Sequence, residues 1–160
     1  MKLRALIVSE KVITSHGTWA TGKMPRSAFP LSKSGTKAYK LGNRRWRVVA
    51  FDVCGATCRL LINYSHALGQ FQAMLGVQHG GDTKVLGTLE LHPTHGGWHA
   101  HVGCDSKDVP AGIRRGPWIR RMSGSKGCYS RKCPETDDEA YRMAVDFFRL
   151  DKTPGGGGLL

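Results

Sequence analysis

Residues 84–102 read KVLGTLELHPTHGGWHAHV, and this stretch decides the fold that we expect. Apolar residues alternate with other residues up to Glu90, and a second alternation places His99 and His101 between apolar neighbours. A period of two is typical of a strand with one buried face. The proline and the glycine pair between the two halves favour a turn. The stretch therefore predicts a β-hairpin with one apolar face and one polar face.

The polar face of this hairpin has the composition of a metal site. Side chains two residues apart on a strand share a face, so His99 and His101 should lie side by side, with Glu90 on the neighbouring strand. Two imidazoles and a carboxylate suit a divalent ion, and we expect manganese or magnesium, with zinc as an alternative. His92 and His95 flank the turn and could orient these ligands or contact phosphate. The alternative is an exposed sheet face with histidines and no metal.

The same stretch resembles the core of the plasmid rolling-circle replication initiators, a branch of the HUH endonuclease superfamily. The resemblance rests on a strand that ends in Glu90, a glycine-containing turn and the Trp-His-x-His strand at 98–101. Upstream, the apolar strand 47–53 stands where these initiators have their first motif strand, and helical spacing of apolar residues predicts a helix over 67–76. Strand, helix, strand, strand is the order of that family, and the likeness covers about residues 45–105.

The resemblance implies that single-stranded DNA is nicked by a tyrosine, which becomes linked to the 5′ phosphate, while a bound metal ion polarises the scissile phosphate. Two tyrosines are candidates. Tyr129 stands in a Tyr-x-x-Lys sequence, in which Lys132 would contact phosphate. Tyr141 lies in an expected amphipathic helix at 137–150, whose first turn is acidic. Tyr141 is equally well explained as an aromatic residue of the core, and Tyr129 as an aromatic residue of a loop.

Basic residues are in large excess. The 160 residues contain 24 Lys and Arg against 12 Asp and Glu, a formal net charge of +12, which favours a polyanionic partner. Residues 114–132 contain seven basic residues and no acidic one, and they interleave arginines with aromatic residues. Arginine binds phosphate, and aromatic rings stack on unpaired bases, so the run suits single-stranded DNA or another nucleic acid; a solvated basic face is the alternative. The expected contacts are Arg114, Arg115, Trp118, Arg120, Arg121, Lys126 and Arg131.

We expect one domain of α+β class, with a central antiparallel sheet in an HUH/RRM-like arrangement, helices packed on one face, and the metal and DNA site on the other. Residues 1–44 are interpreted as an irregular basic arm, 45–151 as the HUH-like domain, and 152–160 as a flexible glycine-rich tail. No apolar run approaches the ~18 residues of a membrane span, so no membrane contact is expected. Five cysteines without a secretory signal favour reduced thiols in the cytoplasm.

Two hypotheses for function follow. The first is a metal-dependent endonuclease that nicks and rejoins single-stranded DNA, as in rolling-circle replication. The second is a non-catalytic protein of a mobile element such as a phage or plasmid, built on a degenerate initiator domain. Such a protein would bind nucleic acid or a host nucleoprotein, as an inhibitor of the anti-CRISPR type does. Metal-dependent hydrolysis without a tyrosine is a third possibility. It would be recognised by cleavage that survives replacement of both tyrosines.

Overall fold

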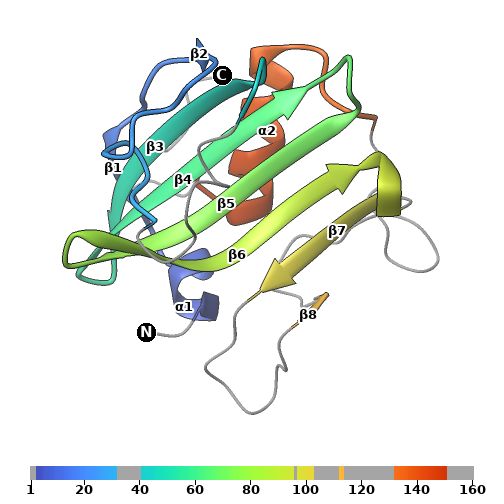
Figure 1. Cartoon of the computed structure of the whole chain (residues 1–160). Coiled ribbons are helices and arrows are strands. Elements are labelled where there is room, and N and C mark those ends of the chain that lie inside the picture. The colour runs from blue at the N-terminus through green and yellow to red at the C-terminus, as the bar shows by residue number, and fades with distance from the viewer. Residues whose placement is uncertain (1–2, 32–40, 96, 103–111, 114–131, 151–160) are drawn as a thin grey trace, which may run out of the picture.

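The computed structural model describes residues 3–31, 41–95, 97–102, 112–113 and 132–150, and its centre is one antiparallel sheet (Figure 1). The strands in the described residues are β1 (Val12–Ser15), β2 (Ala20–Thr21), β3 (Arg45–Val53), β4 (Ala56–Ser65), β5 (Gln70–His79), β6 (Asp82–His92), β7 (Gly97–Val102) and β8 (Gly112–Ile113). The helices are α1 (Leu3–Val8), α2 (Asp137–Phe148) and the short 3-10 helix η2 (Pro93–His95). The fold is a mostly-β member of the α+β class.

The sheet is built largely from sequential hairpins. Its strand order is β1-β3-β4-β5-β6-β7-β8, with β2 also paired to β3, and the neighbours pair antiparallel. Short turns join β3 through β7, and three of them use glycines with positive φ: Gly55 (74°), Gly69 (60°) and Gly80 (60°). From β3 to β7, each strand pairs with the next strand in the chain. The register of these pairings is therefore largely set by the turns that join them.

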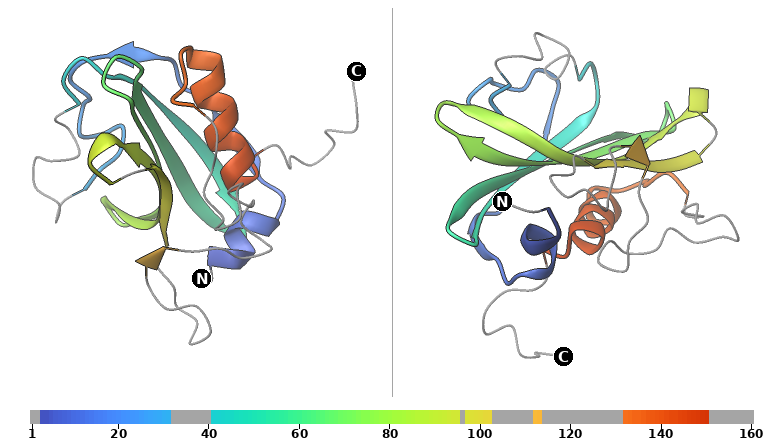
Figure 2. Two further views of the ribbon diagram at one scale, coloured as in Figure 1. Left: turned by 90° about the vertical axis from the view of Figure 1, so that its right-hand side faces the viewer. Right: turned by 90° about the horizontal axis from the view of Figure 1, so that it is seen from below.

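One face of the sheet carries the main hydrophobic core. Figure 2 shows α1 and α2 on the same side of the sheet, and buried residues of both helices pack there against the strands. The largest of these contributions from α2 are Phe147 and Phe148, which are 1% and 0% exposed. They meet residues such as Phe51, Leu60 and Phe71 from the strands. We therefore call this side the helix face.

The opposite face is covered only in part by described residues. A second core cluster forms where Met24, Phe29, Leu31 and Leu41 pack against Leu61. Partly buried residues of β3 and β5 pack against it, namely Trp46, Val48 and Met74. The part of this face that lies over β6 and β7 presents polar side chains instead, and we call it the polar face.

The N-terminus of α2 is tied to the sheet. Asp137 accepts hydrogen bonds from Arg45 (Nη2 to Oδ2, 2.5 Å) and from the Tyr64 hydroxyl (to Oδ1, 2.7 Å). Thr136 caps the helix, since its hydroxyl accepts from the backbone N–H of Glu139. These contacts fix where α2 lies on β3 and β4.

The segment before β3 also joins the cores. Leu6 and Ile7 of α1 are buried in the main core, and Lys11 is 1% exposed. The Lys11 ammonium donates to the carbonyl oxygens of Ile7 and Ser9, each at 2.9 Å, at the end of α1. A cation at a helix C-terminus compensates the unpaired carbonyl groups there.

Three of the expected elements are confirmed and one is wrong. The strand at 47–53, the hairpin at 84–102 and the helix at 137–150 correspond to β3, to β6 with β7, and to α2. The helix expected over 67–76 is instead a turn followed by β5. Both faces of β5 are covered there: Phe71 packs in the main core and Met74 against the second cluster. Apolar residues on both sides of a strand mimic helical spacing.

Candidate metal centre

The hairpin of β6 and β7 brings three ligand-type side chains together. Glu90 pairs directly with His99, and His101 pairs with Thr88, two residues before the glutamate. Ligand atoms of Glu90, His99 and His101 all lie within 4.8 Å of one another, and the Glu90 Oε2 to His99 Nε2 distance is 3.4 Å. The residues between the ligands, Leu89 and Ala100, are buried in the main core. The expected convergence of these side chains on the polar face is therefore confirmed.

The geometry of this metal-ligand group is close to that of a divalent-ion site. Metal–nitrogen bonds of roughly 2.1 Å allow two ligand atoms on one ion to lie at most about 4.2 Å apart. The distance between Glu90 and His99 already meets this limit. His101 is exposed, so its ring has room to turn inward and shorten the longest separation. A carboxylate with two imidazoles suits zinc and manganese in particular.

A chain of side-chain amides orients the carboxylate. The Gln72 amide donates to Glu90 Oε1 (2.9 Å), and Asn63 donates to Gln72 Oε1 (3.0 Å). Arg44 in turn donates to Asn63 Oδ1 (3.0 Å) and to Gln70 Oε1. Because Gln72 holds Oε1, Glu90 presents Oε2 to the imidazoles. We call these four residues, Arg44, Asn63, Gln70 and Gln72, the polar relay.

Sequence reasoning missed the polar relay. The available signal was the alternation of Gln70 and Gln72 with the apolar Phe71 and Ala73. A helix over this segment would distribute the polar residues around its surface. The two glutamines were therefore not expected to face the hairpin. Asn63 is fully buried in a strand, and a buried amide needs hydrogen-bond partners, which Arg44 and Gln72 provide.

His92 also borders the metal-ligand group. Its Nε2 lies 3.9 Å from Glu90 Oε2, and its ring centroid lies 4.7 Å from that of His99. Its Nδ1 is 3.0 Å from the Thr94 hydroxyl, which limits rotation of the ring. The side chain of His95 lies outside the described residues. Of the two histidines expected to support the ligands, His92 is thus placed beside them.

A pocket of about 370 Å³ adjoins this site. It is lined by Arg44, Gln70, Phe71, Gln72, Glu90, Leu91, His92, Pro93 and Thr94. Glu90 belongs both to the pocket wall and to the metal-ligand group. A ligand in the pocket would therefore lie next to a bound metal ion.

Tyr141 lies away from the metal-ligand group. It packs against the main core on the helix face, with the Arg47 guanidinium carbon 4.3 Å from its ring centroid. Its hydroxyl is 3.4 Å from His16 Nδ1. Because Glu90 and the two histidines project from the opposite face, the sheet separates Tyr141 from them. Its contacts agree with the alternative role as a core aromatic residue.

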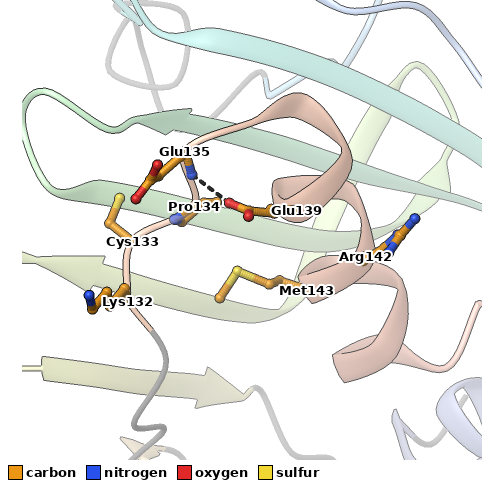
Figure 3. Close-up of a pocket in the computed structure, with 7 residues that line it drawn as sticks. All are labelled: Lys132, Cys133, Pro134, Glu135, Glu139, Arg142 and Met143. Carbon is orange, nitrogen blue, oxygen red and sulfur yellow. Dashed lines mark hydrogen bonds between the residues drawn. The ribbon is translucent and has the colours of Figure 1, made fainter.

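The remaining expected residues lie elsewhere. Lys132 is exposed and lines a pocket of about 360 Å³ beside α2 (Figure 3). The other residues around this pocket are Cys133, Pro134, Glu135, Glu139, Arg142 and Met143. Burial raises the pKa of the Cys133 thiol, so this thiol is less readily ionised than a free one. Tyr129 and the expected nucleic-acid contacts between residues 114 and 131 lie outside the described residues.

No protein-family model, curated protein or solved structure matches this chain. Among the described residues, no helix has the length and apolar character needed to cross a membrane. The geometry of the metal-ligand group is therefore the basis for a functional proposal.

Proposed function

We propose that this protein is a metal-dependent endonuclease of HUH type, which nicks single-stranded DNA on its polar face. The observation that carries the proposal is the convergence of ligand atoms from Glu90, His99 and His101 within 4.8 Å. The formal net charge of +12 supports a polyanionic substrate. The HUH/RRM-like fold assignment, with the DNA site opposite the helices, is part of the same proposal.

In this mechanism the chain supplies ligands, orientation and a nucleophile. A divalent cation, when bound, polarises the scissile phosphate and stabilises its developing charge. His99 and His101 would hold the ion through ring nitrogens, and Glu90 through a carboxylate oxygen. Gln72 keeps the carboxylate turned toward the imidazoles. Glu90 and the histidines thus need little rearrangement to bind the ion.

Tyr129 is the nucleophile of this proposal, because Tyr141 lies across the sheet. The Tyr129 oxygen attacks phosphorus, and the bond from phosphorus to the 3′ oxygen breaks. The products are a phosphotyrosine at the 5′ end and a free 3′ hydroxyl, which takes up the proton. The energy of the phosphodiester is kept in the new bond, so the strand can be rejoined.

Binding without turnover is the second candidate function. It is favoured by the position of Tyr141 on the helix face, which leaves one fewer tyrosine for catalysis. In that case the metal-ligand group and the basic residues of the chain would recognise nucleic acid or a host nucleoprotein as an inhibitor does. No covalent product would form.

An adduct assay tests the proposal. Single-stranded DNA labelled at its 3′ end is incubated with protein and Mn²⁺, and labelled protein is detected on a denaturing gel. Wild type and Tyr141→Phe should form the adduct, whereas Tyr129→Phe and the double variant His99→Ala/His101→Ala should not. His79→Ala, at an exposed histidine of β5, is the matched control for histidine removal and should behave as wild type.

The other outcomes also decide between hypotheses. Cleavage without an adduct that survives Tyr129→Phe combined with Tyr141→Phe would assign the attack to water rather than to a tyrosine. Tight DNA binding with no cleavage by wild type would support the second candidate. Absence of both DNA binding and Mn²⁺ binding, measured by calorimetry, would refute the assignment of the site.

A further inference from the structure

Arg44 is a half-buried cation in the wall of the pocket beside Glu90. Its hydrogen bonds within the described residues go to Asn63 Oδ1 and Gln70 Oε1, which are neutral amide oxygens. Burial lowers the pKa of its guanidinium, although arginine remains charged at neutral pH. In the described part of the chain, therefore, no carboxylate compensates this charge.

The guanidinium keeps donors for a further partner. It carries five N–H groups in a planar fork, and the two bonds to the amides use one hydrogen of each terminal nitrogen. A partly desolvated cation without a counterion favours binding of an anion, and the fork matches the oxygens of a phosphate. Gln70 and Gln72 line the same pocket and hold the fork and the Glu90 carboxylate in place.

The position of Arg44 relative to Glu90 suits a nucleic-acid strand. The relay crosses from Asn63 on β4 to Gln72 on β5 and Glu90 on β6, and neighbouring strands lie roughly 4.8 Å apart. The Arg44 guanidinium also reaches Gln70 on β5, the strand that pairs with β6, so it lies roughly one to two strand spacings, about 5–10 Å, from Glu90. The distance between consecutive phosphates of a DNA strand falls within this range. A strand with one phosphate at the metal-ligand group could thus place the next one near Arg44.

We infer that Arg44 binds a second phosphate of the DNA strand, adjacent to the one at the metal-ligand group. The ligand class is an oligonucleotide with at least two consecutive phosphodiesters. The inference rests on the proposed function for the identity of this polyanion. Arg44 acts here as a binding residue that sets the minimum length of the substrate.

The test compares thymidine di- and trinucleotides, which contain one and two phosphodiesters. Their affinities for wild type, Arg44→Gln and Arg44→Lys are measured by calorimetry, with chelator and again with Mn²⁺. Wild type should bind the trinucleotide about 10-fold more tightly than the dinucleotide, as expected for a charged hydrogen bond. Arg44→Gln should bind the two equally, and Arg44→Lys should keep part of the difference because it keeps the charge.

A matched control separates this site from general charge loss. Arg142→Gln removes the same charge from an exposed position of α2, beside the helix face, and should retain the preference for the trinucleotide. The salt dependence of trinucleotide affinity should fall by about 0.7 in logarithmic slope only for Arg44→Gln.

The outcomes distinguish this inference from the proposed function. Wild type with no preference for the trinucleotide, or Arg44→Gln with an unchanged preference, would overturn the inference even if Mn²⁺-dependent nicking is observed. A preference that depends on Arg44 in chelator would support it even if no strand is cut. Competition by inorganic phosphate as strong as by the trinucleotide would overturn the assignment to a strand. If Arg44→Gln does not fold, as judged by circular dichroism, the test rests on the trinucleotide preference of wild type and of Arg44→Lys. No preference in wild type, or an unchanged preference in Arg44→Lys, would then overturn the inference.

Discussion

Arg44 and Arg45 are neighbours in the chain, but they lie on opposite faces of the sheet and meet different partners. Arg45 forms an ion pair with Asp137 on the helix face, and its hydrogen bond to this carboxylate raises the pKa of the guanidinium. Arg44 bonds neutral amides on the polar face, and burial lowers its pKa. Among the described residues, Arg45 thus has a carboxylate partner on the helix face, whereas the hydrogen bonds of Arg44 on the polar face go to neutral amides.

The same division applies to the two faces as a whole. On the helix face, Asp137 has two hydrogen-bonded partners, and the surrounding residues are buried in the main core. On the polar face, Glu90 and the histidines stand partly exposed beside a pocket. Stability should therefore depend mainly on the helix face and ligand binding on the polar face. The following predictions test that separation.

The largest effect is expected from Phe147→Ala on the helix face. Phe147 is 1% exposed, and removal of a buried aromatic ring typically costs about 3–5 kcal/mol. Urea denaturation should show this loss in the free energy of unfolding. His99→Ala, on the other face, should change stability far less but weaken Mn²⁺ binding. If Phe147→Ala remains folded yet loses Mn²⁺ binding, the two faces are coupled and the comparison fails.

A smaller effect is expected from Gln72→Leu on the polar face. Gln72 touches Glu90 but not the ion itself, and loss of such a supporting hydrogen bond typically reduces metal affinity about 10-fold or more. Calorimetric titration with Mn²⁺ measures the change. Gln78→Leu, at an exposed position of the same strand, is the matched control and should bind as wild type. Equal affinities for the two variants would contradict a positioning role for Gln72.

The smallest effect concerns Asp137. The hydrogen bond from Arg45 holds the pKa of this carboxyl below its ordinary value of 3.8, so its stabilisation is present above that value and is lost as the pH falls through the lower, folded-state pKa. Both side chains are about one-third exposed, and solvent screening limits the contribution to about 1 kcal/mol or less.

Unfolding experiments with Asp137→Asn measure this contribution. The variant should be less stable than wild type at neutral pH, and the difference should shrink as the pH falls through the acidic range. Asp138→Asn changes the same charge at an exposed position of the same helix turn and is the control. A difference between Asp137→Asn and wild type that stays constant with pH would exclude the ion pair as its cause.

Much of the candidate site could be predicted because its geometry is local. One hairpin contains Glu90, His99 and His101. In a hairpin, the alternation of residues determines which face each side chain lies on, and a short turn determines the approximate register of the two strands. The helix α2 was also predictable, because its capping residues and amphipathic spacing lie within one segment. The strand β5 was not, since residues distant in sequence cover both of its faces and obscure its alternation.

The sequence by itself thus determined the strands around the hairpin, the helix α2 and the convergence of Glu90, His99 and His101, because each depends on contacts between residues close in the chain. Only the tertiary structure decided that Gln72 supports Glu90, that Arg44 lines the adjoining pocket and that Tyr141 lies across the sheet. Those facts depend on which strands become neighbours and on which face α2 packs. Such long-range pairings arise from the burial of the whole core and have no signature in a single segment.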